Sequence, residues 1–248
     1  MARIGIIGGS GLDNPDIMSK PQDRVVTTIW GEPSAPLKLG MIAGVEVALL
    51  GRHGREHTIP PSQVNYRANI QALKDAGCSH ILATTAVGSL REEIGRGDLV
   101  IIDQFIDFTK QRAMTFHESF EPHHPMHAPF DPHLRAILDG VCERQGFVYH
   151  KSGTVVTIEG PRFSTRAESR MFRAWGADII NMSIATEAAL ANEAGIPYAA
   201  IAMSTDYDCW KEDEEAVSWE AVLAVFKENA RKVTTLLVEA IPLVTKLG

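Results

Sequence analysis

The amino-acid sequence predicts an α/β protein in which one mixed, twisted sheet is flanked by helices. Short apolar runs of strand length, such as residues 4–7 and 80–83, alternate with segments that have the apolar spacing of helices. The 248 residues are 45% hydrophobic and 22% charged, which is enough apolar material for one large core. Because no linker-like stretch interrupts this pattern, we expect residues 1–248 to form a single domain.

In the first half of the chain, strands are expected where short apolar runs are bounded by Gly or Pro. The expected strands cover residues 4–7, 25–30, 37–42, 45–50, 80–83 and 99–102. The second to fourth of these would form a meander or hairpin. A helix is expected over residues 60–76, where Val64 and three alanines form one stripe. Residues 84–89, Thr-Thr-Ala-Val-Gly-Ser, are expected to be a hydroxyl-rich turn.

In the second half, residues 107–131 have no periodic pattern and are expected to be a long irregular stretch, which in compact domains is commonly functional. A helix is expected from Pro132 until Gly146, and another after the capping box of Thr165 and Glu168. The remaining expected elements are strands at 154–158, 178–182 and from 198, and helices at 186–194 and from 218.

Charge and cysteine content limit the function classes. The formal net charge is −7 and the pI is about 5.7, so nucleic acid is not an expected partner. The three cysteines, Cys78, Cys142 and Cys209, form no C-x-x-C pair and suit a reducing compartment. No apolar run approaches 18 residues, and a strand-like run follows Met-Ala-Arg directly, where a signal peptide would lie. We therefore expect a cytoplasmic protein without a membrane partner.

Two acids follow the apolar run that begins at Tyr198. Asp206 and Asp208 lie where ligands gather in α/β folds, beyond the carboxyl end of a buried strand. Two close carboxylates are costly to bury unless they are paired or one stays protonated, so they are candidates for acid chemistry. An acidic surface loop explains their spacing equally well, because charged residues continue from Lys211 to Glu215.

Three expected strand ends offer groups that bind phosphate. They are the glycine turn around Ser10, the pair Arg52-His53, and the hydroxyl-rich segment that begins at Thr84. Backbone N–H groups, hydroxyls and a planar guanidinium together suit this anion. The glycines match neither a dinucleotide fingerprint nor a Walker loop. Each segment alone is unspecific, and their recurrence at strand ends favours one shared anion site.

Other candidate residues have commoner structural explanations. Phe163 could stack on a flat ring, but a lone aromatic more often packs in a core, and Met182 also defaults to packing. Five histidines suggest a metal cluster at first sight, but they lack the ligand spacing of known zinc sites, so we expect no metal. They are His117, His123, His124, His127 and His133.

Six ordered motifs lie between residues 6 and 210, within a likeness that spans residue 4 to about residue 241. They are Ile-Ile-Gly-Gly-Ser-Gly-Leu (6–12), Arg-His-Gly-Arg-Glu-His-Thr (52–58), Thr-Thr-Ala-Val-Gly-Ser-Leu (84–90), Glu-Gly-Pro-Arg-Phe-Ser (159–164), Ile-Asn-Met-Ser (180–183) and Thr-Asp-Tyr-Asp-Cys-Trp (205–210). Together they resemble the trimeric purine nucleoside phosphorylase family, in particular members that act on methylthioadenosine. The resemblance implies a nucleoside phosphorylase-like fold and a homotrimer.

The implied reaction is phosphorolysis of S-methyl-5′-thioadenosine to adenine and 5-methylthioribose 1-phosphate, a step of purine and methionine salvage. Inorganic phosphate would be a co-substrate, and no cofactor is implied. By the same resemblance the phosphate site would comprise Ser10, Arg52, His53, Thr85, Ala86 and Ser183. The catalytic residues would be Asp206, Asp208 and Ser183.

The resemblance also assigns the nucleoside contacts. Phe163 would pack against the purine and Met182 along the ribose, while Asp206 meets N7 and Asp208 the exocyclic amine. The methylthio pocket would be formed by Trp219, Val222 and Leu223 and closed by His123 of a neighbouring subunit. Relatives tend to carry a smaller aliphatic residue at the position of Trp219, so the shape of this pocket is open.

The chemistry of the bond agrees with this assignment. Breaking a ribosyl C–N bond builds positive charge on the sugar, which phosphate stabilises, and negative charge on the base, which a proton at N7 relieves. An ionised Asp208 accepts from a 6-amino group and repels a 6-oxo group. Three alternatives stay open: a purine nucleoside phosphorylase of broader or 6-oxopurine specificity, including methylthioinosine, a nucleosidase that uses water, and a non-catalytic purine sensor.

Overall fold

The structure, a computed structural model, describes residues 3–8, 17–119, 123–213 and 218–247, without the side chains of Trp219, Ala221, Leu223, Phe226 and Glu228. Within these residues one sheet of 11 strands is formed. Its strands are β1 (Arg3–Gly8), β2 (Ser19–Arg24), β3 (Leu37–Ile42), β4 (Val45–Gly51), β5 (Cys78–Ser89), β6 (Leu99–Ile101), β7 (Gln104–Phe108), β8 (Tyr149–His150), β9 (Thr154–Ile158), β10 (Ile179–Asn181) and β11 (Tyr198–Asp206). The helices are α1 (Tyr66–Asp75), α2 (Pro132–Gln145), α3 (Arg166–Ala174), α4 (Ile184–Glu193), α5 (Trp219–Val244) and the short 3₁₀ helix η2 (Pro61–Gln63).

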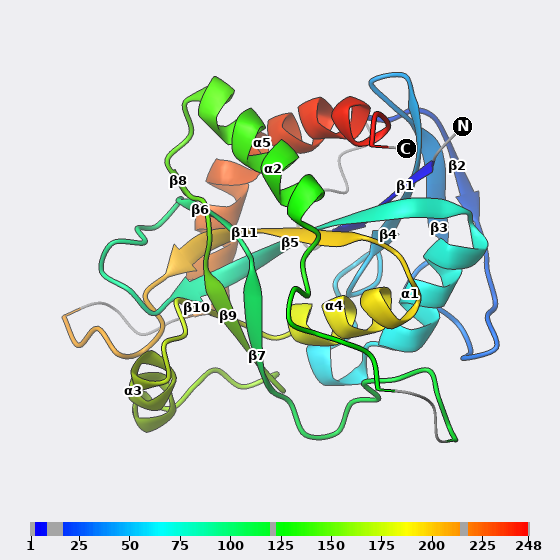
Figure 1. The fold of residues 1–248 in the computed structure, drawn as a ribbon. Coiled ribbons are helices and arrows are strands. Elements are labelled where there is room, and N and C mark those ends of the chain that lie inside the picture. The colour runs from blue at the N-terminus through cyan, green and yellow to red at the C-terminus, as the bar shows by residue number, and fades with distance from the viewer. Residues whose placement is uncertain (1–2, 9–16, 120–122, 214–217, 248) are drawn as a thin grey trace.

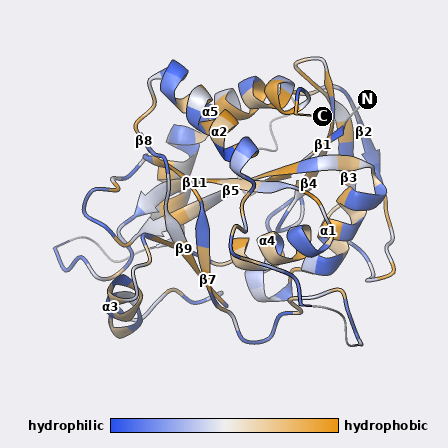
Figure 2. Ribbon diagram, viewed as in Figure 1, coloured by the Kyte–Doolittle hydropathy of each residue, from blue (hydrophilic) through white to orange (hydrophobic). Residues whose placement is uncertain are grey.

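Helices cover both faces of the sheet. Helices α2 and α5 lie on one face, and α1 and α4 lie on the other (Figure 1). Along β11, Ala200 and Ala202 join the core cluster of α1 and α4, whereas Ala199 and Ile201 join that of α2 and α5. This burial on both sides explains why the run is continuously apolar. Figure 2 shows the contrast with α2, where hydrophobic and hydrophilic stretches alternate along a helix with one buried face.

Parallel pairing brings together the strands that lead into the predicted anion-binding segments. Strand β1 pairs in parallel with β4 and with β5, so that Gly8 lies opposite Gly51 and Ile7 opposite Ala83. The N–H of Arg52 donates to the Gly8 carbonyl at 2.9 Å. Strand β5 also pairs in parallel with β11. The carboxyl ends of β1, β4, β5 and β11 therefore lie at one edge of the sheet, where α/β proteins bind ligands.

The prediction of a strand at residues 25–30 is wrong. Apart from an isolated bridge between Thr28 and Gly31, this segment is irregular, and the Val25 and Ile29 side chains are 78% and 85% exposed. The strand of this region is instead the polar β2, which pairs with β3 at the sheet edge and is exposed along its length. An exposed edge strand buries no apolar face, so a search for apolar runs misses it.

The prediction of a turn at residues 84–89 is also wrong, because these residues form the second half of β5. Pairing with β11 continues as far as Gly88, and antiparallel pairing with β10 follows at Gly88 and Ser89. Neighbouring strands therefore keep extended a segment whose composition favours a turn. Strand β7 was not predicted, and its last two residues, Asp107 and Phe108, fall in the stretch expected to be irregular.

Several predicted helix ends are confirmed, and others are shifted. The Thr165–Glu168 capping box is present at α3, and Gly146 ends α2 in the left-handed conformation, at φ +65°. The helix expected from residue 60 begins only at Tyr66, because η2 precedes it and Asn65 accepts the Ala68 N–H at 3.1 Å as its cap.

Candidate active site

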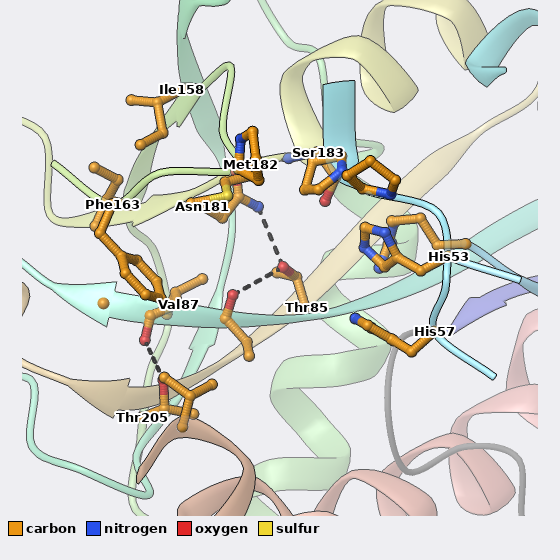
Figure 3. Close-up of a pocket in the computed structure, with 18 of the residues that line it drawn as sticks. His53, His57, Thr85, Val87, Ile158, Phe163, Asn181, Met182, Ser183 and Thr205 are labelled. Carbon is orange, nitrogen blue, oxygen red and sulfur yellow. Dashed lines mark hydrogen bonds between the residues drawn. The ribbon is translucent and has the colours of Figure 1, made fainter. Parts of the chain in front are cut away.

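A cavity of about 630 Å³ opens at the carboxyl ends of β4, β9, β10 and β11, beside the second half of β5. Phe163 lies toward one end of it and the two histidines His53 and His57 toward the other, with Thr85 between them (Figure 3). Cavities of this size hold small molecules. The predicted site residues that line it are Arg52, His53, Thr85, Ala86, Phe163, Met182, Ser183, Asp206, Asp208 and Val222.

The remaining predicted site residues are not brought together by the described part of the chain. Ser10 lies outside the described residues, as do the side chains of Trp219 and Leu223. His123 is exposed and does not line the cavity of its own chain. The pocket predicted for the 5′ group is thus represented by Val222, which is 7% exposed.

The two acids lie at the end of β11, where Asp208 is buried and Asp206 is partly buried, rather than in an exposed acidic loop. Asp208 is 5% exposed, and its N–H donates to Asp206 Oδ1 at 2.8 Å. The Thr205 hydroxyl donates to Asp206 Oδ2 at 2.8 Å. Asp208 has a φ of +50°, a left-handed conformation that is uncommon for non-glycine residues and that recurs at functional sites. Burial raises the pKa of both carboxyls, which favours a protonated acid in the cavity.

A glycine in β5 makes room for this pair. A Cβ at Gly88 would lie 2.9 Å from Asp206 Oδ1 and 3.0 Å from Ile180 Cγ2, closer than side chains pack. The missing side chain therefore allows β5 to pass directly beside the Asp206 carboxyl. A residue that looked like part of a flexible turn is required for close packing of two strands.

Arg52 is held at the end of β4 by a buried acid that the sequence analysis missed. Its Nε and Nη2 donate to Glu187 Oε1 and Oε2 at 2.5 and 3.0 Å, and its Nη1 donates to the Thr84 carbonyl at 2.8 Å. The Tyr198 hydroxyl donates to Glu187 Oε2 at 2.8 Å. Burial would lower the pKa of Arg52, but the charge and hydrogen bonds of Glu187 outweigh it, and the pKa is raised. The guanidinium is thus charged and fixed in direction.

A signal for Glu187 exists in the sequence. This glutamate stands in α4 among alanines, Ile184 and Leu190, and the helix is buried on nearly every side. A charge in a helix without a polar face must be paired, because an unpaired buried carboxylate is very costly. The sequence does not reveal that the partner is Arg52, 135 residues away.

His53 is neutral in this environment. Burial and then the Arg52 charge lower its pKa to about 3. Its Nδ1 lies 2.9 Å from the Ile59 carbonyl, and a carbonyl only accepts, so Nδ1 carries the proton. The other ring nitrogen, Nε2, therefore has a lone pair that can accept a hydrogen bond from the O–H group of a bound, partly protonated oxyanion.

A second buried network, also missed, joins three segments around the cavity. The Arg112 side chain is 3% exposed and donates to Glu159 Oε1 at 3.0 Å and to the Tyr66 hydroxyl at 3.0 Å. The Tyr66 hydroxyl lies 3.3 Å from the Met182 carbonyl. This network ties the loop that carries Phe163 to the segment that carries Met182. Arg112 lies in the stretch without a periodic pattern, where no local signal marks it.

Over the described ranges, no group of three or more His, Cys, Asp or Glu side chains is arranged to hold a metal ion. In that same part of the chain, no helix is both long enough and apolar enough to cross a bilayer.

Comparison with known proteins agrees with this geometry. A family model, the Phosphorylase superfamily, matches residues 3–242. The chain belongs to this superfamily. The phosphorylase is 57% identical over 247 residues to the S-methyl-5′-thioadenosine phosphorylase of Xenopus tropicalis, covering 97% of this chain and 88% of that protein. It is 55% identical over 252 residues to the enzyme of the same name from Danio rerio, covering 99% and 90%.

Solved structures show the same fold for this phosphorylase. The methylthioadenosine phosphorylase of Schistosoma mansoni in complex with adenine has a TM-score of 0.95 at 44% identity, covering 100% of this chain and 93% of that chain. A variant of the adenosine/methylthioadenosine phosphorylase from that organism, in complex with methylthioadenosine, has a TM-score of 0.94 at 42% identity, with the same coverage. The predicted nucleoside phosphorylase-like fold is therefore confirmed.

Proposed function

We propose that this enzyme cleaves S-methyl-5′-thioadenosine with inorganic phosphate to give adenine and 5-methylthioribose 1-phosphate. The observation that carries the proposal is one cavity lined by two acids, Asp206 and Asp208, and also by Arg52, His53 and Thr85. Curated relatives named S-methyl-5′-thioadenosine phosphorylase, 48–57% identical to this chain over nearly its whole length, support the choice of substrate.

In the proposed reaction the glycosidic C–N bond breaks and a phosphate oxygen bonds to the anomeric carbon. The proton that phosphate loses is balanced by the proton that the adenine gains. Arg52, His53, Thr85, Ala86 and Ser183 hold the phosphate, together with Ser10. The guanidinium is already fixed by Glu187, so little reorganisation accompanies charge development in the transition state.

At the base end, a protonated Asp206 donates to N7 of the departing adenine. Burial supports this role because it raises the pKa of Asp206, so the carboxyl keeps its proton at higher pH than a free Asp. An ionised Asp208 accepts from the exocyclic amine. Phe163 packs against the purine and Met182 along the ribose, and Ser183 completes the catalytic set with the two acids.

The 5′ methylthio group enters a pocket formed by Trp219, Val222 and Leu223. His123 of a neighbouring subunit closes this pocket in a homotrimer, which is consistent with the exposure of His123 in its own chain. The proposal includes a single domain over residues 1–248, a cytoplasmic location and no cofactor beside the phosphate co-substrate.

The decisive experiment measures adenine release from methylthioadenosine with and without phosphate. Phosphorolysis requires that turnover collapses without phosphate and that 5-methylthioribose 1-phosphate forms in equal amount to adenine. Adenine release at the same rate without phosphate would establish a nucleosidase and contradict the proposal. Tight adenine binding without any turnover would instead establish a purine sensor.

The substitution Asp208→Asn is expected to shift base preference toward 6-oxopurines. An Asn side chain donates a hydrogen bond that suits a 6-oxo group, whereas the ionised Asp accepts from a 6-amino group. We expect the ratio of kcat/KM for methylthioadenosine over methylthioinosine to fall by about tenfold or more, the equivalent of one discriminating hydrogen bond. An unchanged ratio would show that Asp208 does not contact position 6 of the base.

A further inference from the structure

A series of hydrogen bonds leads from helix α4 to Thr85, and each group in it donates to the next one. The Ala185 N–H donates to Thr157 Oγ1 at 3.1 Å. A backbone N–H can only donate, so Thr157 accepts there and must place its own proton elsewhere. The Thr157 hydroxyl lies 2.8 Å from Asn181 Oδ1 and donates to it.

Two donors determine which way the Asn181 amide faces. Its Oδ1 accepts from the Thr157 hydroxyl and lies 3.4 Å from the Ser183 N–H. The amide nitrogen therefore faces the other way and donates to Thr85 Oγ1 at 3.3 Å (Figure 3). The exposed fractions of Thr157, Asn181 and Thr85 are 0%, 6% and 7%, so little solvent competes with this order.

The donor-to-acceptor order of these hydrogen bonds decides whether the Thr85 hydroxyl presents a proton or a lone pair to the cavity. Because Thr85 Oγ1 accepts from Asn181, its proton remains to be donated, and in this structure it donates to the Ala86 carbonyl at 3.1 Å. An amide turned the other way would take the Thr85 proton and leave only lone pairs facing the cavity. A phosphate dianion needs donors, so only the observed direction suits it.

We propose that Thr157 and Asn181 are positioning residues that set the Thr85 hydroxyl as a hydrogen-bond donor to the phosphate co-substrate. This inference rests on the proposed phosphorolysis, since it takes the anion beside Thr85 to be phosphate. Thr157 is completely buried, so it acts through Asn181 and Thr85 rather than by contact with the substrate.

The test is the substitution Thr157→Val, which keeps the shape of the side chain and removes the hydroxyl. We expect the KM for phosphate to rise about tenfold, as for a lost hydrogen bond to a charged group. The KM for methylthioadenosine, and kcat at saturating phosphate, should stay within about twofold. Thr157→Ser should restore the KM for phosphate. The control is Thr154→Val, the same change on the opposite face of β9.

A double-mutant cycle separates positioning from general stability. Thr85→Val should raise the KM for phosphate, and adding Thr157→Val to it should raise this KM no further, because both changes remove one donor. Asn181→Asp should raise it more than tenfold, because its second carboxylate oxygen takes the Thr85 proton and adds negative charge. If Thr157→Val does not fold, Asn181→Asp decides the question.

Additive effects in the cycle, or equal shifts in the KM for phosphate and for the nucleoside, would overturn the inference. So would an unchanged KM for phosphate in Asn181→Asp. These results differ from failure of the proposed function, which would appear in the wild-type enzyme as turnover that does not depend on phosphate.

Discussion

Asp206→Asn is expected to lower kcat for methylthioadenosine phosphorolysis by about 10²- to 10⁴-fold, with a much smaller change in KM. An amide keeps the size of the side chain but cannot supply the proton that relieves charge on the departing adenine. That proton matters most in the transition state, so its loss appears in kcat. Steady-state kinetics measure the effect, and Asp213→Asn, at an exposed acid, provides the control.

The pH dependence gives a second measure of the same acid. Burial raises the pKa of Asp206 above its ordinary 3.8, and the protonated form is the donor, so kcat should fall as pH rises through the raised pKa. The native state also holds this proton more tightly than the unfolded chain, so the Asp206 contribution to the free energy of unfolding falls from pH 3.8 up to that pKa. Asp206→Asn should remove both trends. If KM rose by as large a factor as kcat fell, Asp206 would not be the proton donor to the departing adenine.

Glu187→Ala is expected to lower the free energy of unfolding by about 3–5 kcal/mol, because it leaves the Arg52 guanidinium buried without a counter-charge. The pair has 2% and 0% exposed side chains, so water cannot replace the lost carboxylate. Denaturant unfolding measures the change. Glu212→Ala, which breaks the exposed pair with Arg170, is the matched control and should cost about 0–1 kcal/mol.

A paired replacement tests the physical reason for that loss. Removing both charges, with Arg52→Met and Glu187→Leu together, should recover much of the stability, since no buried charge remains. The same variant should still bind phosphate poorly, because the fixed guanidinium is gone. A stability loss in Glu187→Ala no larger than in Glu212→Ala would contradict the importance of the buried pair.

Features with local determinants were predictable. The Thr165–Glu168 capping box, the Gly146 helix end and the hairpin of β3 and β4 each depend on residues close together in the chain, and the structure confirms them. Strand β2 and the extended form of residues 84–89 were not predictable in this way. A polar edge strand has no apolar pattern, and the second half of β5 is kept extended by β10 and β11.

For the site, the chemical groups could be recognised along the chain: two acids after one strand, and a guanidinium, an imidazole and hydroxyls near others. The folded structure was needed to show that Arg52 pairs with Glu187, and that Asn181 turns its amide nitrogen to Thr85 across 96 residues. The physical reason is that charge and hydrogen-bond direction in a buried site depend on the partner across space. That partner is supplied by strand pairing and helix packing, which local sequence patterns do not encode.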